Sequence, residues 1–354
     1  MRKRLDFLSV HLPIADLEFS VVILLAVGFC VGTLSGFFGV GGGWVITPLL
    51  NIFGFSMPLA IGTSLVQTFG QSIIATAKHS RMGNVDWKLG LLSILGSIAG
   101  VEVGKQAIFF LEEMGLAGVV IRWVYIVFLS GLGTYVMRDY FAARRVERMR
   151  ASDRPSNPSA PKNSSSAAVK FRGLALGPFV SLPTSGIQSI SFWSLFIIFL
   201  AAGFLSGFMG VGGGFILLPA LIYLVGVPTT AAIGTSLLGV TFMAGYGSFI
   251  YSLAGQTELI AAAFMLVGAS FGTQLGALAT RYVHGYGIRL LFSIMLLLAG
   301  VSVALKQVYS IIGHRILGSL AGIVVLGAAG GMALLVIIRL FIGIRKSRQE
   351  QGYA

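Results

Sequence analysis

Long apolar segments alternate with short polar ones along this chain, and most of the apolar segments are about 20 residues long. A helix of that length crosses a hydrocarbon core roughly 30 Å thick. Because lipid cannot satisfy exposed backbone groups, we expect an all-α integral membrane protein without strands. The predicted segments span residues 20–50, 59–80, 88–108, 117–137, 191–225, 231–253, 259–280, 287–305 and 317–342.

The composition agrees with this pattern. Of the 354 residues, 56% are hydrophobic and 10% are charged, against about 25% charged in a typical soluble domain. We therefore expect a multi-pass protein of the cell inner (plasma) membrane. Residues 1–19 are predicted to be a cytoplasmic leader, because the apolar run that follows continues past any plausible signal cleavage point.

The net charge of +13 lies mainly at the edges of the apolar segments. Nine of the 25 Lys and Arg residues fall between Arg138 and Arg172. Basic residues that flank apolar segments mark the cytoplasmic ends of membrane helices. We expect anionic lipid headgroups as partners of these loops and no binding of nucleic acid.

The chain contains an internal repeat. "LSGFFGVGGGWVITPLL" at 34–50 matches "LSGFMGVGGGFILLPAL" at 205–221, and "AIGTSL" at 60–65 recurs at 232–237. This predicts two homologous repeats of about four helices, at 20–138 and 191–306, with the first helix of each broken at its glycines. Residues 139–190, basic and rich in Ser and Pro, are predicted to be a cytoplasmic linker, and 317–342 an additional helix.

The crossing count leaves three arrangements open. If each glycine-broken run crosses once, each copy has four crossings, and the copies lie parallel with leader and linker both cytoplasmic. This arrangement is the favoured one, although it leaves the basic C-terminus on the opposite side. If both halves of a broken run cross, the C-terminus is cytoplasmic when this happens in the second copy, but the linker is not when it happens in the first. In the third arrangement the broken runs are re-entrant.

The glycine runs are the strongest candidates for a binding site. Consecutive glycines cost about 1 kcal/mol each in a helix interior relative to alanine, so the backbone is expected to unwind there. The next half-helix then offers free N–H groups to an anion, as in transporters with broken helices. The predicted substrate-binding glycines are Gly39, Gly41, Gly42, Gly43, Gly210, Gly212, Gly213 and Gly214. Glycines at four-residue spacing are instead expected to pack helices together; these are Gly96, Gly100, Gly104, Gly268, Gly272 and Gly276.

Polar side chains follow each glycine run. Thr63 and Ser64, and equally Thr235 and Ser236, could bond to the backbone or donate to a bound oxyanion. Gln67 and Gln71 share one helix face, whereas Gly239 and Met243 occupy the corresponding positions of the second copy. We predict that both hydroxyl pairs and both glutamines contact the substrate.

Few charged residues lie inside the predicted spans. Glu102 could pair with Lys105, relay protons or lie near a membrane surface. His79 and Arg81 sit at a helix end, where they anchor the helix at the interface or couple transport to protons. No His, Asp, Glu or Cys residues have metal-ligand spacing, and no nucleotide-binding or catalytic motif occurs. We expect no metal, no cofactor and no enzymatic activity.

The paired "GFFGVGGG" and "GFMGVGGG", each followed by a proline, then "AIGTSL" and "HSRMGNVD", resemble the TauE/SafE family of membrane permeases. The resemblance covers residues 20–306 and implies two four-helix repeats that transport sulfur-containing anions. The resulting prediction is export of sulfite or sulfoacetate-like organosulfonates by alternating access around the glycine breaks. The alternatives are a proton-coupled importer of small organic anions and a membrane scaffold that binds a partner through its linker.

Overall fold

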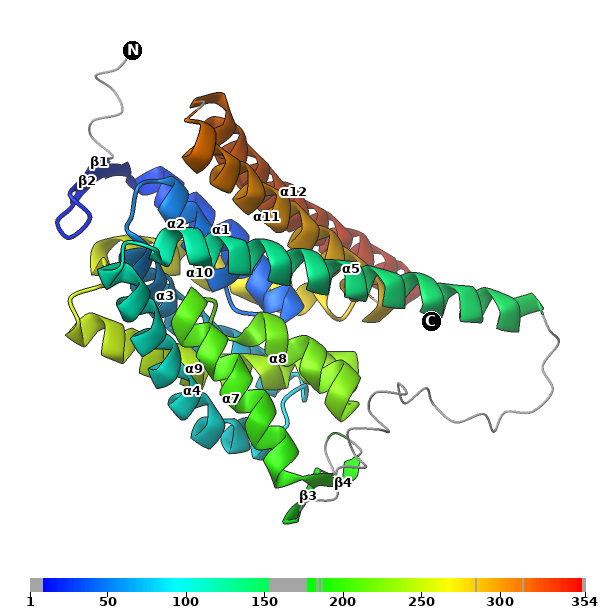
Figure 1. Ribbon diagram of the computed structural model, residues 1–354. Helices are drawn as coiled ribbons and strands as arrows, with labels where there is room; N and C mark the ends of the chain where they lie inside the picture. Colours follow the sequence, from blue (N-terminus) through cyan, green and yellow to red (C-terminus); the bar gives the residue numbers. More distant parts are fainter. Residues whose placement is uncertain are drawn as a thin grey trace.

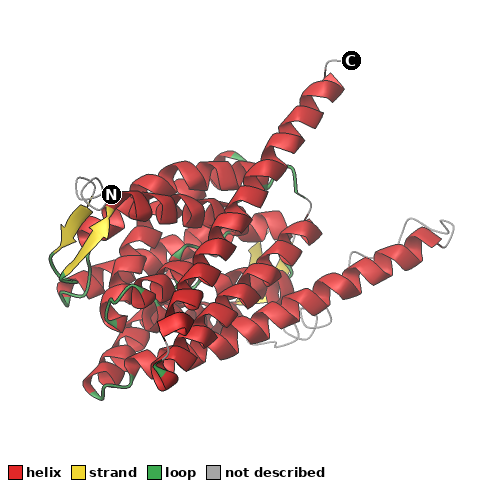
Figure 2. Ribbon diagram, turned by 90° about the horizontal axis from the view of Figure 1, so that it is seen from above, coloured by secondary structure: helices red, strands yellow, loops and turns green. Residues whose placement is uncertain are grey.

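The protein is a bundle of helices with one short strand hairpin at each end (Figures 1 and 2). The computed structural model describes residues 9–152, 177–182, 185, 187–283, 285–313 and 315–351. The first copy comprises β1 (Ser9–Leu12), β2 (Leu17–Ser20), α1 (Val21–Phe38), α2 (Gly43–Ile52), α3 (Met57–Arg81), α4 (Trp87–Glu113) and α5 (Ala117–Ser152). The second comprises β3 (Phe179–Leu182), β4 (Ile187–Ser191), α7 (Phe192–Met209), α8 (Gly214–Ala220), the π-turn η4 (Leu221–Val225), α9 (Thr229–Leu253), α10 (Leu259–Ala279) and α11 (Gly285–Ile312), and α12 (Arg315–Gln351) follows.

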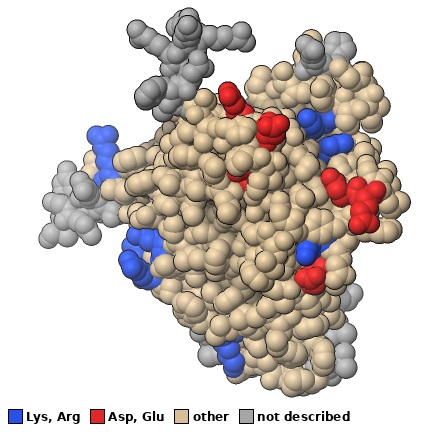
Figure 3. Space-filling model, turned by 90° about the vertical axis from the view of Figure 1, so that its left-hand side faces the viewer, with Lys and Arg blue, Asp and Glu red and all other residues tan. Residues whose placement is uncertain are grey.

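The all-α membrane class is confirmed. Eight helices among the described residues are long and apolar enough to cross a membrane. Uncharged atoms cover most of the face seen in Figure 3, where Lys, Arg, Asp and Glu occur in small separate groups. Large apolar side chains such as Leu95, Val127 and Phe271 are more than half exposed, which suits contact with lipid.

The expectation that the chain has no strands is wrong. β1 pairs with β2, and β3 with β4, in antiparallel register. Both hairpins lie at the ends of the bundle, where unpaired edges can meet water, so the constraint imposed by lipid does not apply to them. The first hairpin occupies the second half of the predicted leader, and residues 1–8 lie outside the described part.

The predicted linker is partly helical, since α5 continues through Ser152. Residues 153–176 of the linker lie outside the described part, and β3 and β4 form its end.

The two copies have matching elements. The helices α1 and α7 are both 18 residues long, and each ends at a glycine with left-handed backbone, Gly39 and Gly210. The helices α3 and α9 both have 25 residues.

The first glycine break turns the chain back on itself. The ring of Phe53, just after α2, lies 4.9 Å from that of Phe19, just before α1. Both ends of the α1–α2 unit are therefore at the same end of the bundle. The broken run is re-entrant, and the prediction that it crosses once is wrong. The chain reverses at Gly39 and Gly41, whose positive φ angles of 75° and 77° cost glycine little because it has no Cβ atom.

The copies are inverted, so the predicted parallel arrangement is also wrong. The Ile14 amide donates to the Glu258 carboxylate before α10, whereas the Ser185 hydroxyl donates to Asp86 before α4. Each hairpin thus caps the other copy's helix, at opposite ends of the bundle (Figure 1). The reason is that α3, α4 and α5, an odd number of crossings, separate the two hairpins. We call these ends the β1 end and the β3 end.

Glycines at four-residue spacing hold the inverted copies together, as predicted. A Cβ atom added at Gly96, Gly100 or Gly104 of α4 would strike backbone carbonyls of α7. In the same way, the glycines of α10 (Gly268, Gly272 and Gly276) lie against carbonyls of α1. Both helix pairs approach so closely that no side chain fits between their backbones.

Candidate functional site

The two glycine breaks meet at the centre of the bundle. A Cβ atom on Gly43 would strike the Gly210 carbonyl, and one on Gly214 would strike the Val40 carbonyl. Residues 31–50 are all buried. The predicted glycines of both copies therefore come together, in a conformation that is closed to solvent.

Two equivalent serines hold the breaks. The Ser64 hydroxyl donates to the Gly210 carbonyl at 2.8 Å, and the Ser236 hydroxyl donates to the Gly39 carbonyl at 2.5 Å. Thr47 adds a bond of 3.2 Å to Gly210. The helices α3 and α9 therefore each hold the glycine break of the other copy in place.

The neighbouring threonines bind the backbone as well. The Thr63 hydroxyl accepts a hydrogen bond of 2.8 Å from the backbone N–H of Glu258, and the Thr235 hydroxyl accepts one of 2.9 Å from the backbone N–H of Asp86. Two roles were considered for these hydroxyls, and hydrogen bonding to the backbone is the one present in this structure. Their contact with a substrate stays a prediction.

Gln67 and Gln71 of α3 lie beside the first break and leave polar atoms without partners. The Gln67 amide donates to Gln71 Oε1 at 2.7 Å, while Gln67 Oε1 and Gln71 Nε2 have no hydrogen-bond partner. Both side chains are 0% exposed. A Cβ atom on Gly42 would lie 3.2 Å from Gln67 Oε1 and would strike Gln71 Nε2.

Thr68 belongs to the same group, although the sequence did not single it out. Its buried hydroxyl has no partner, and its methyl group would contact Cβ atoms on both Gly41, at 3.1 Å, and Gly212, at 2.8 Å. A buried unpaired polar group typically costs about 1–3 kcal/mol. The signal that could have identified Thr68 is its position next to Gln67, with the apolar Val240 as its counterpart.

The second copy is apolar at the corresponding place. The Met243 sulfur lies next to Gly213, and Gly239 has Leu217 beside it. The central site is therefore polar on the α3 side and apolar on the α9 side. We call Gln67, Thr68, Gln71 and the two glycine breaks the central cluster.

His79 lies away from the central cluster and is fully buried. Because a carbonyl can only accept, His79 Nε2 donates to the Gly36 oxygen at 2.9 Å, and Asn84 donates to Nδ1 at 3.4 Å. Arg81 is exposed at the end of α3.

Glu102 is also not brought to the central cluster by any hydrogen bond among the described residues. It accepts from the Tyr246 hydroxyl at 3.0 Å and from Gln106 at 3.2 Å. Lys105 instead lies over the Phe109 ring at 5.5 Å, so the considered pairing with Glu102 does not form. A proton-coupling role for His79, Arg81 or Glu102 stays a prediction.

Within the described residues, no group of three His, Cys, Asp or Glu side chains could hold a metal ion. The central cluster offers amides, a hydroxyl and backbone groups. The amide N–H and hydroxyl groups can donate to the oxygen atoms of a ligand, and the amide and carbonyl oxygens are acceptors.

Comparison with known proteins adds relatives in three organisms. The chain is 27% identical to a "Probable membrane transporter protein" of Bacillus subtilis (strain 168), YunE, over 82% of this chain and 100% of the relative. A protein of the same description from Methanocaldococcus jannaschii is 27% identical over 69% of this chain and 78% of its own. One from Xylella fastidiosa (strain 9a5c) is 26% identical over 74% and 86%. No solved structure matches.

The family comparison covers most of the chain. The family model described as "Sulfite exporter TauE/SafE" matches residues 24–303, which include both glycine breaks and the polar side of α3. With its helices of membrane-spanning length and its transporter relatives, the chain belongs to the sulfite exporter TauE/SafE family and is a membrane transporter.

Proposed function

We propose that this transporter is a permease for small oxyanions such as sulfite or organosulfonates, and that it binds them at the central cluster. The observation that carries the proposal is the set of buried polar atoms without partners on Gln67, Thr68 and Gln71. A ligand with several oxygen atoms would accept from the Gln71 amide and the Thr68 hydroxyl. The N–H groups of the first residues of α2 add further donors, because a helix start leaves such groups without intrahelical acceptors; the Val45 N–H is already used, since it donates to the Gly42 carbonyl at 3.1 Å.

The closed state of the cluster supports alternating access. Ser64 links α3 to the glycine break of the second copy, and Ser236 links α9 to the glycine break of the first. Rocking one copy against the other would therefore open the cluster on one side at a time. Inverted repeats that bind substrate at broken helices work in this manner in other transporters.

We further propose that the β3 end faces the cytoplasm. The hairpin β1–β2 of the predicted leader then lies on the other side of the membrane, so leader and linker are not both cytoplasmic. The C-terminal part of α5, with Arg144 and Arg145, and the C-terminal half of α12, with Arg339 and Arg345, lie at that end, in keeping with the positive-inside rule. Export of a monovalent anion would then gain about 2.3 kcal/mol per 100 mV of interior-negative potential.

Flux into liposomes tests the proposal. Purified protein is reconstituted, and uptake of labelled sulfite and sulfoacetate is followed under an imposed potential. Gln71→Met keeps the side-chain volume but gives α3 the residue found at the same place in α9, so we expect loss of most of the flux. Gln274→Met, at an exposed position of α10, is the matched control and should transport normally.

Two outcomes would reject the proposal. One is an absence of flux above empty liposomes for sulfite, organosulfonates and short carboxylates. The other is normal flux by Gln71→Met. A flux that requires a proton gradient and disappears in Glu102→Gln would instead favour the proton-coupled importer, with Tyr246 as the partner of that carboxylate.

A further inference from the structure

Two small cavities occupy equivalent places near opposite ends of the bundle. Each lies where the proline of a short helix (α2 or α8) faces α5 and α11. The cavity toward the β1 end is lined by Pro48, Asn51, Ile52, Met57, Arg122 and Lys306, among others. The cavity toward the β3 end is lined by Pro219, Ile222, Tyr223, Thr229, Arg289 and Phe292, among others.

The sequences of α5 and α11 explain the correspondence. Ile121-Arg122 in α5 aligns with Ile288-Arg289 in α11, and the same alignment places Asp139 opposite Lys306. Each cavity is thus lined by an arginine from one helix, and the other helix places a second charged residue close to that cavity. The second charge is negative at the β3 end and positive at the β1 end.

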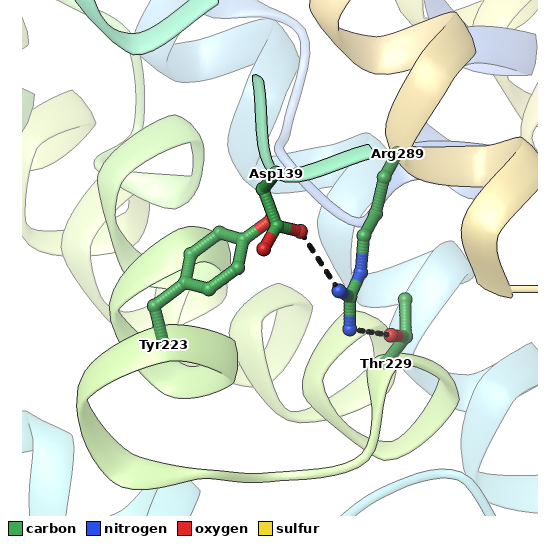
Figure 4. A network of polar contacts seen from close by, with 4 residues as sticks. All are labelled: Asp139, Tyr223, Thr229 and Arg289. Atoms are coloured by element: carbon green, nitrogen blue, oxygen red, sulfur yellow. Dashed lines mark hydrogen bonds and ion pairs between the residues drawn. The ribbon is translucent and has the colours of Figure 1, made fainter. Parts of the chain in front are cut away.

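At the β3 end the charges neutralise each other (Figure 4). Arg289 forms an ion pair of 3.1 Å with Asp139. Tyr223 donates to the same carboxylate at 2.9 Å, and Arg289 donates to Thr229 at 3.0 Å. This cavity therefore has no demand for a further ion.

At the β1 end both charges are positive. Arg122 donates to the Gln307 side chain at 2.6 Å and to Ser310 at 3.5 Å, and Lys306 lies 5.1 Å from the centre of the Tyr309 ring. These partners are uncharged, and neither cation pairs with a carboxylate in the part of the chain that the structure describes. Both are partly buried, so water screens their repulsion incompletely.

We propose that Arg122 and Lys306 bind an oxyanion at the opening of the β1-end cavity, whose interior volume of about 10 Å³ holds no more than a water molecule. A guanidinium can hold two oxygens of a sulfate, sulfonate or phosphate at once, and the ammonium adds a third contact. The oxyanion is either free in solution or the phosphate of an anionic lipid. The cavity lies near the second glycine break, because its lining residue Tyr125 donates to the Met209 carbonyl, next to Gly210, at 2.9 Å.

Equilibrium binding tests the proposal separately from transport. The full-length protein in uncharged detergent at low ionic strength is titrated with sulfate, and the rise in unfolding temperature gives the dissociation constant. Lys306→Asp gives the β1 end the charges of the β3 end. We expect it to weaken sulfate binding by about tenfold or more, because hydrogen bonds to a charged group contribute about 1.5–3 kcal/mol.

Three controls keep the result decisive. Lys105→Gln removes one positive charge elsewhere and should bind sulfate as the original protein does. Lys306→Gln replaces Lys306→Asp if the latter does not fold. Gln71→Met removes a donor from the central cluster, so sulfate binding that survives in this variant and is lost when Lys306→Asp is added belongs to the β1-end cavity, whether or not the proposed transport function holds.

The source of the oxyanion is decided by a second titration. Short-chain phosphatidylglycerol is compared with phosphatidylcholine in the same assay. Binding of sulfate that depends on Lys306 indicates a free anion, and binding of phosphatidylglycerol alone that depends on Lys306 indicates a lipid headgroup. The proposal is overturned if neither ligand binds, or if both bind equally well to the Lys306 variants.

Discussion

In the first copy of the repeat, His79 donates to the carbonyl of Gly36, and in the second copy Tyr251 donates to the equivalent carbonyl of Gly207 at 2.7 Å. Different side chains thus make the same contact in the two copies, between α3 and α1 in the first and between α9 and α7 in the second. The serine and threonine bonds at the breaks also agree between the copies.

The copies differ beside the breaks and in the end cavities. Gln67 and Gln71 align with Gly239 and Met243 of the second copy, and Lys306 stands where the other end has Asp139. Contacts present in both copies hold an inverted bundle together, so they are explained by folding alone. Polar differences that leave atoms or charges unpaired are not explained by these shared contacts, and both binding-site proposals rest on them. The following predictions test this distinction.

The largest effect is expected from a symmetric packing position. Gly272→Leu would force α10 away from α1, where the Phe29 carbonyl lies against the glycine. Overpacking of a core typically lowers the free energy of unfolding by about 1–3 kcal/mol. Because a backbone contact cannot relax as a side chain does, we expect a destabilisation at the upper end of this range or a loss of folded protein. Size-exclusion chromatography and thermal unfolding measure it. The control is Gly131→Leu, where nothing lies within 4 Å; equal damage there would contradict the packing explanation.

A smaller and equal effect is expected at the two serines. Ser64→Ala and Ser236→Ala each remove a buried bond to a carbonyl of the opposite break, at a typical cost of about 1–3 kcal/mol. Thermal unfolding should shift similarly in both variants. If only one variant is destabilised, the two bonds are not equivalent.

Removing one charge beside each end cavity should change the stability of the protein in different ways. Asp139→Asn breaks the Arg289 ion pair, whose side chains are 21% and 31% exposed, and we expect a loss of at most about 1 kcal/mol. Lys306→Gln relieves repulsion with Arg122, and without oxyanions in the buffer it should leave stability unchanged or raise it. Thermal unfolding at low ionic strength compares the two, and equal destabilisation would remove the argument for an unpaired charge.

The smallest effect is expected from His79→Tyr, which gives the first copy the side chain of the second. A hydroxyl can replace the bond to Gly36, so folding and flux should be nearly unchanged, whereas His79→Ala should be destabilised. Flux in liposomes and thermal unfolding provide both readouts. A folded His79→Tyr protein without flux would instead indicate a proton-carrying role for the imidazole.

Much of the fold could be predicted from the sequence. Apolar segment length fixed the membrane class and the positions of most helices. The spacing of Gly96, Gly100 and Gly104 predicted close helix packing, because a missing side chain has the same consequence wherever the partner helix comes from. The hairpins were missed because strands of four or five residues carry little periodicity.

The candidate site was predicted in part. The glycine runs and the α3 glutamines were found from the repeat, while Thr68, Arg122 and Lys306 were not. Arg122 and Lys306 lie 184 positions apart, on α5 and α11, and only the α5–α11 alignment relates them to Arg289 and Asp139. A charge near a helix end is usually explained by anchoring at the membrane surface, so neither residue attracted attention alone.

The sequence by itself determined the membrane class, the duplication, the glycine breaks and the residue types beside them, because these depend on local composition and spacing. Only the tertiary structure decided that the copies are inverted, that the first broken run re-enters, and which polar atoms remain unpaired. Those properties depend on which helices pack together, and a carbonyl such as that of Gly210 gains its partner Ser64 only when the two copies fold against each other.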